Sequence, residues 1–170
     1  MKLKTSAIIL IIFFALAGLV IWGYSNNGNT AAGVQGAEPS GAKSALSAPS
    51  AFYDFGTISM KNGNVSHDFI LANPGREDIV INGIQTSCMC TTALLVEPDG
   101  SAKGPFGMPG MGGMTSTNDT VKGGEAKTLR VIFDPNAHGP AGVGEIDRFI
   151  TVADSSGASL QYEIKATVTP

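Results

Sequence analysis

The chain has 170 residues, of which 14 are acidic and 11 are basic, so its formal net charge at neutral pH is −3. This length allows one compact domain beside its terminal segments and excludes two. A mildly acidic chain without a basic stripe is not expected to bind nucleic acid.

Residues 1–24 predict a membrane anchor. Lys2 and Lys4 precede an apolar stretch that runs without interruption from Ala7 to Trp22. With its flanks, this stretch just reaches the roughly 17 to 20 residues that a transmembrane helix needs. Trp22 and Tyr24 suit the membrane interface, and the two lysines favour the cytoplasmic side. We expect a single-pass anchor with an extracytoplasmic domain; the alternative is a cleaved signal segment and a secreted domain.

Residues 25–50 are rich in Gly, Ala, Ser and Asn, and they include Pro39 and Pro49. This composition is typical of a flexible linker. The folded domain is therefore expected at residues 51–170.

This domain shows the alternating and β-branched patterns of β-strands, separated by turn sequences such as Asn73-Pro74-Gly75. The runs lie at residues 52–58, 65–71, 78–84, 86–96, 129–133, 146–153 and 160–168. About seven short strands without an amphipathic helix predict an all-β, immunoglobulin-like sandwich of two antiparallel sheets. Its core is expected to contain Phe69, Leu71, Ile81, Val131, Phe133, Ile164 and Val168.

A Gly- and Pro-rich segment at about residues 98–122 breaks the strand pattern, and no regular element is expected there. A loop of this length inside a compact domain is usually functional or disordered. It carries Met108, Met111 and Met114 at intervals of three residues.

Cys88 and Cys90 are the only cysteines of the chain and its main candidate for chemistry. On a strand, residues two apart face the same side, so the two sulfur atoms would lie together. Thiolates and thioethers select Cu(I), which makes Cys88, Cys90, Met108, Met111 and Met114 a candidate copper site. The cysteines could instead be small apolar core residues, a redox pair, or a disulfide that would be strained on an extended strand.

The two histidines carry weaker signals. His67 shares the alternation phase of Phe69 and is expected to be partly buried, whereas His138 lies in a Pro/Gly turn and is expected to be exposed. With no Gly-x-Ser-x-Gly motif and no indicated pair of nucleophile and base, an enzyme is not expected.

Five short motifs follow one another along the chain, namely Phe55–Ile58, His67–Phe69, Asn73–Gly75, Ser87–Thr92 and Gly123–Glu125. In this order the chain resembles the bacterial domain-of-unknown-function family fifteen seventy-three (DUF1573), over residues 52–168. The resemblance implies an immunoglobulin-type sandwich of the ASH and major-sperm-protein group, exported behind a signal or lipid anchor, without an established enzymatic activity. Two departures are Met89, where the family usually has Gly, and the Gly/Met-rich segment, which resembles an insertion.

Together these features predict a membrane-tethered, extracytoplasmic module of the bacterial envelope that binds another envelope protein or has a structural role, without catalysis. The alternative is binding or handling of Cu(I) by the cysteine pair and the methionines. A third hypothesis is a thiol redox protein, although Cys-x-Cys lacks the helix N-terminus that activates the usual Cys-x-x-Cys motif.

Overall fold

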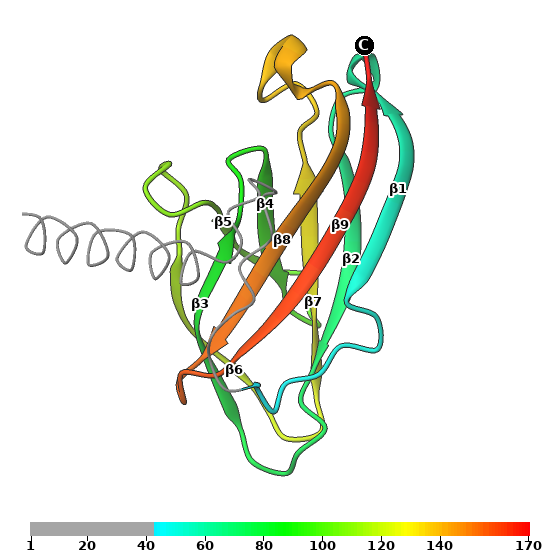
Figure 1. Cartoon of the computed structure of the whole chain (residues 1–170). Helices are drawn as coiled ribbons and strands as arrows, with labels where there is room; N and C mark the ends of the chain where they lie inside the picture. The colour runs from blue at the N-terminus through cyan, green and yellow to red at the C-terminus, as the bar shows by residue number, and fades with distance from the viewer. Residues whose placement is uncertain (1–42) are drawn as a thin grey trace, which may run out of the picture. The chain divides into compact units, whose positions relative to one another are not determined.

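The computed structural model describes residues 43–170, which form a sandwich of two β-sheets (Figure 1). The predicted anchor at residues 1–24 and most of the predicted linker lie outside the described residues. Over the range 43–170, no helix has the length and apolar character needed to cross a membrane.

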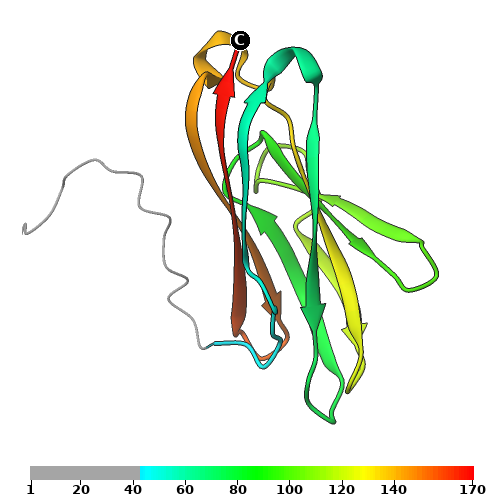
Figure 2. The same ribbon diagram turned by 90° about the vertical axis from the view of Figure 1, so that its right-hand side faces the viewer.

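The first sheet has the strand order β1-β9-β8-β3-β6, and the second has the order β2-β7-β4-β5. Figure 2 shows the two layers, with β1, β8 and β9 in one and β2 and β7 in the other. The strands are β1 (Phe52–Ser59), β2 (Val65–Ala72), β3 (Ile79–Thr86), β4 (Thr91–Val96), β5 (Ala102–Phe106), β6 (Ser116–Val121), β7 (Ala126–Phe133), β8 (Gly144–Asp154) and β9 (Ser159–Thr169). Two short 3-10 helices are η1 (Met60–Asn62) and η2 (Gly139–Gly142).

Strand β1 runs parallel to β9, so the prediction of purely antiparallel sheets is wrong for this pair. Phe52 lies opposite Glu163 and Ser59 lies opposite Thr169, with a shift of register between Asp54 and Thr57. Gly56 lies within this shift at a φ of +66°, a conformation that favours glycine. The alternation of side chains along one strand is the same in both pairing directions, so the sequence pattern cannot distinguish them.

The prediction that residues 98–122 hold no regular element is wrong, because β5 and β6 lie there. Each of these strands forms one edge of a sheet, where β5 pairs with β4 and β6 pairs with β3. An edge strand tolerates Pro105 because one side of its backbone has no neighbouring strand to bond. The two additional strands raise the number from about seven to nine.

The sandwich also includes the end of the predicted linker, at residues 43–50. Leu46 is buried in the core at 2% exposure. Ser47 exchanges backbone hydrogen bonds of 2.8 Å with Ala72 at the end of β2, and the Ser44 hydroxyl donates to the carboxylate of Asp154. The folded domain therefore begins before Ala51.

The core prediction is confirmed, since each of the seven expected side chains is buried. Tyr162 on β9 is also fully buried, and its hydroxyl donates a hydrogen bond of 3.1 Å to the carbonyl oxygen of Ile70 on β2. Burial raises the pKa of the Tyr162 phenol well above its ordinary value of 10.0. This neutral hydroxyl thus joins the two sheets across the core.

Candidate functional site

Cys88 and Cys90 lie in the tight turn between β3 and β4, and the prediction that they occupy a strand is wrong. The Thr86 hydroxyl is 3.0 Å from the carbonyl oxygen of Cys88 and 2.9 Å from that of Thr91. The Thr91 amide donates to the Cys88 carbonyl at 3.1 Å, and the Asp134 amide donates to the Cys90 carbonyl at 2.8 Å. These bonds replace the strand ladder and fold the segment back on itself.

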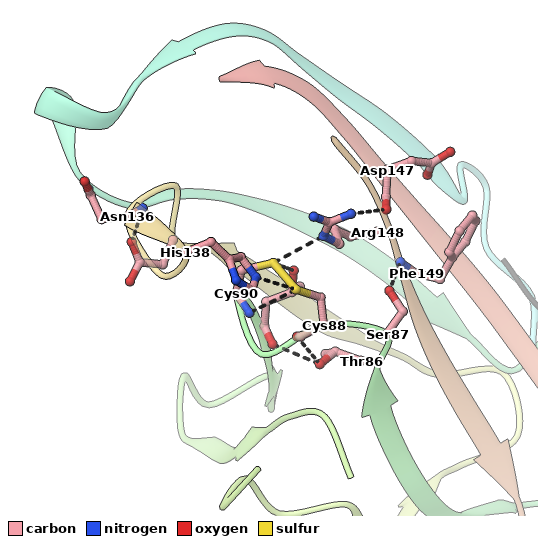
Figure 3. The surroundings of a disulfide bond; sticks show 11 residues. Thr86, Ser87, Cys88, Cys90, Asn136, His138, Asp147, Arg148 and Phe149 are labelled. Atoms are coloured by element: carbon pink, nitrogen blue, oxygen red, sulfur yellow. Dashed lines mark hydrogen bonds between the residues drawn. A yellow bond between two sulfur atoms is a disulfide. The ribbon is translucent and has the colours of Figure 1, made fainter. Parts of the chain in front are cut away.

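The two sulfur atoms are joined as a disulfide (Figure 3). The Cα atoms lie 5.3 Å apart, within the usual span of about 4.4–6.8 Å for bridged cysteines. An extended strand would hold them at or beyond the upper limit of that span. Of the alternatives open from the sequence, the structure contains the disulfide, and the turn is what permits it.

His138 lies beside the disulfide. Its Nε2 atom is 3.2 Å from the Sγ atom of Cys88, and the ligand atoms of Cys88, Cys90 and His138 all lie within 4.8 Å of one another. The segment that carries His138 follows β7 and is held in place by Asn136, whose side chain donates a hydrogen bond of 2.8 Å to the Met60 carbonyl. His138 is exposed, as predicted, and its approach to Cys88 is a contact that the sequence does not indicate.

Arg148, on β8, approaches the other sulfur atom (Figure 3). Its Nε–H donates to the Cys90 Sγ atom at 3.2 Å, and one terminal nitrogen donates to the Asp147 carbonyl at 2.8 Å. Burial lowers the pKa of this guanidinium from its ordinary value. Within residues 43–170 Arg148 forms no salt bridge, so the sulfur of Cys90 is its side-chain partner.

The two cysteines differ in exposure. Cys90 is buried at 2% exposure, whereas Cys88 is partly exposed. Cys88 and His138 are therefore accessible to a reagent or ion from solvent, whereas Cys90 is not.

The methionine segment begins next to this turn. The Thr86 amide donates to the Gly107 carbonyl at 3.2 Å, and the Gly107 amide donates to the Met114 carbonyl at 2.9 Å. Met111 and Met114 are 54% and 50% exposed, and Met108 is partly buried. A shared site of Met108, Met111 and Met114 with the cysteines stays a prediction.

His67 lies on β2 and is packed among aromatic rings. Its ring stacks on Tyr53 with centroids 3.6 Å apart and meets Phe69 edge-on at 4.7 Å. Burial lowers the pKa of His67 from its ordinary value. The expectation of a partly buried histidine is confirmed, and these contacts assign it a role in packing.

Two sheets packed face to face over an apolar core, with short connections at both ends, define an immunoglobulin-like β-sandwich. Residues 46–101, which include β1 to β4 and the cysteine turn, match the family described as "Protein of unknown function (DUF1573)". The family predicted from the short motifs is thus confirmed over this segment.

Solved structures are similar to this chain at low sequence identity. A protein of unknown function from Porphyromonas gingivalis W83 is 16% identical with a TM-score of 0.52, over 75% of this chain and 46% of that one. The ASH/PapD-like domain 7 of human CEP192 is 11% identical with a TM-score of 0.47, over 84% and 97% of the two chains. The secreted serine protease VesC from Vibrio cholerae is 12% identical with a TM-score of 0.45, over 74% and 24%.

This chain spans less than half of the Porphyromonas protein and about a quarter of VesC. At 16% identity the likeness to the Porphyromonas protein concerns the fold alone. No curated protein matches the sequence.

Proposed function

We propose that this chain is a membrane-tethered immunoglobulin-like module that binds another protein on the extracytoplasmic side of the bacterial envelope, without catalysis. The apolar stretch from Ala7 to Trp22 supports the tether. The observation that carries the binding role is the exposure of three methionines, one in the cysteine turn and two in the segment that is hydrogen-bonded to it.

These methionines are Met89, in the cysteine turn, and Met111 and Met114, in the segment between β5 and β6, and they are 47%, 54% and 50% exposed. The hydrogen bond between Thr86 and Gly107 holds the two segments that carry them together. Methionine side chains adapt to irregular apolar surfaces and are frequent where proteins bind partners. Met111 and Met114 lie between β5, an edge strand of one sheet, and β6, an edge strand of the other. Such edge strands can pair with an extended segment of a partner.

A binding role without catalysis also fits the oxidation state of Cys88, the reactive side chain at the surface of the site. The Cys88 sulfur lies beside His138 but is bonded to Cys90, so it is not a free nucleophile. We therefore assign the exposed apolar side chains, rather than the thiols, to the recognition of a protein partner.

Site-specific cross-linking of the full chain in bacterial cells tests the binding role. A photo-reactive amino acid in place of Met89 or Met111 should yield a cross-linked product of one defined mass. The matched control is Ile70, which is 43% exposed on edge strand β2. Equal products from Ile70 and Met89, or none from either methionine position, would contradict the proposal. The Cys88→Ser/Cys90→Ser variant should keep the cross-link.

Membrane extraction and protease treatment test the tether and its orientation. We expect the full-length chain to stay with the membrane in alkaline carbonate, and the sandwich to be digested when protease is added outside the cytoplasmic membrane. A soluble product shortened by about the first 24 residues would show that the segment is a cleaved signal and not an anchor.

A further inference from the structure

We propose that Cys88, Cys90 and His138 bind one Cu(I) ion when the disulfide is reduced, and that Arg148 balances the charge of this centre. The inference is independent of the tether and of the protein partner. It replaces the methionine ligands expected from the sequence with a histidine and adds an arginine, both brought to the turn by the fold.

The ligand atoms already converge on one point. The two sulfur atoms and a ring nitrogen of His138 lie within 4.8 Å of one another, and His138 Nε2 is 3.2 Å from Cys88 Sγ. The turn is fixed by Thr86 and Asp134, and the His138 segment is fixed by Asn136. An ion could therefore enter between ligands whose backbones are already positioned.

The ligand types favour a soft ion. Thiolates select Cu(I) and zinc, and imidazole suits copper and zinc alike. A structural zinc site usually takes four protein ligands, whereas this group offers three. Three protein ligands therefore do not form a closed structural zinc site, and zinc here would need a water as its fourth ligand.

The charge of the site separates the two ions further. Cu(I) with two thiolates and a neutral imidazole carries one negative charge, which the Arg148 guanidinium neutralises from 3.2 Å. Zinc with the same ligands would be neutral and would leave the arginine as an unpaired, partly buried cation. Because unpaired buried charge is costly, the monovalent ion is the better match.

Copper binding first requires the disulfide to be reduced. A dithiol reductant can supply two electrons and two protons as its own sulfur atoms join in a disulfide. The bond between Cys88 and Cys90 breaks, and each sulfur gains one proton. Cu(I) then displaces these two protons as it binds the two thiolates. The oxidised protein should therefore bind no copper at this site.

Competition for Cu(I) against a chromophoric chelator tests the site. The full chain, purified in detergent, is reduced with a dithiol, freed of it under anaerobic conditions, and mixed with the Cu(I)–chelator complex. We expect reduced protein to withdraw one equivalent of copper and oxidised protein to withdraw none. The proposal is overturned if the reduced chain withdraws no copper or if the oxidised chain withdraws as much.

Variants test the individual roles. Cys88→Ser should abolish binding, and His138→Ala should weaken it at least roughly tenfold, as losing a ligand costs no less than losing an outer-shell partner. Arg148→Gln should weaken binding by about 10- to 100-fold, and Arg148→Lys should restore part of the loss. The matched control is His67→Ala, which removes the other histidine and should bind as the unaltered chain does.

Replacing Met108, Met111 and Met114 together by Leu separates this site from a methionine site. We expect copper affinity to be unchanged. A large loss in the methionine variant, with none in His138→Ala, would overturn the assignment. X-ray absorption of the copper-loaded chain should show both sulfur and nitrogen neighbours, and a signal from sulfur alone would exclude His138. Circular dichroism of each variant verifies that the sandwich is folded.

Discussion

Asp119 on β6 and Lys127 on β7 form an ion pair between the two sheets. Their side chains are 4% and 8% exposed. Lys103 also pairs with Asp119, and Glu97 also pairs with Lys127, at 2.6 and 2.7 Å. Breaking a buried ion pair is strongly destabilising, because the charge that remains has lost its partner and is not solvated by water.

We expect Asp119→Asn to lower the free energy of unfolding by about 3 kcal/mol, the lower end of the range for broken buried pairs, since Glu97 still contacts Lys127. Urea denaturation measures this change. The control is Asp68→Asn, which breaks a pair with Arg130 whose side chains are 45% and 44% exposed. That variant should keep nearly the same midpoint, and an equal shift in both would contradict the argument.

The same aspartate predicts a loss of stability in acid. Burial alone would raise the pKa of Asp119, but hydrogen bonds from Lys103 and Lys127 outweigh it and hold the pKa below its ordinary value of 3.8. A lowered carboxyl pKa stabilises the folded state above the ordinary value, and this contribution is lost as the pH falls through the folded-state pKa. Urea midpoints should thus be level from pH 7 to about 5 and fall below about 4. Asp119→Asn should flatten part of this fall.

At the scale of single elements, the segment at residues 43–50 is part of the sandwich although its composition is that of a linker. Leu46 is its one large apolar side chain, and it is 2% exposed among core residues. The segment also bridges the sheets, since Lys43 pairs with Ser159 on β9 and Ser47 pairs with Ala72 on β2.

We expect Leu46→Ala to lower the free energy of unfolding by about 2–5 kcal/mol, as for other buried leucines. The matched control, Ile70→Ala, removes a side chain that is 43% exposed and should cost less than about 1 kcal/mol. Chemical denaturation compares the two variants. If Leu46→Ala lowers the free energy of unfolding no more than the control does, residues 43–50 are a linker and not part of the folded domain.

The strands that the sequence predicted well are those that alternate apolar and polar residues, such as β2 and β7, because one face of each is buried. Strands β5 and β6 were not predicted because β5 contains Gly and Pro and β6 is mostly polar, and each is an edge strand that depends on the strand beside it. The burial of Leu46 was not predicted because a single apolar residue forms no periodic pattern. In each case tertiary contacts outweigh the local pattern.

The candidate site likewise has a part that the sequence predicts and a part that it does not. Cys88 and Cys90 are neighbours in the chain, so their spacing alone indicated a pair. His138 and Arg148 lie 50 and 58 residues away from their cysteine partners. No spacing rule links residues so far apart, and only the pairing of β3 with β8 and the path of the segment after β7 bring them together.

At the scale of the whole molecule, the disulfide closes a very small ring and contributes little to folding. The chain-entropy relation gives roughly 1–2 kcal/mol for so short a loop. We therefore expect Cys88→Ser/Cys90→Ser to keep the β-sheet circular dichroism spectrum and to melt less than about 10 °C lower. Loss of the folded spectrum would make the bridge a structural requirement and would rule out this variant as a test of the thiols.

The parallel pairing of β1 with β9 has a mechanical consequence. The described chain enters beside Ser159, at the start of β9, and Pro170 lies at the other end of that strand (Figure 1). A pulling force between these two points would drag β1 and β9 past each other along their length. Their hydrogen bonds would then be loaded in shear, all at once, instead of opening one after another from an end. The sandwich is thus built to resist tension applied along its long axis.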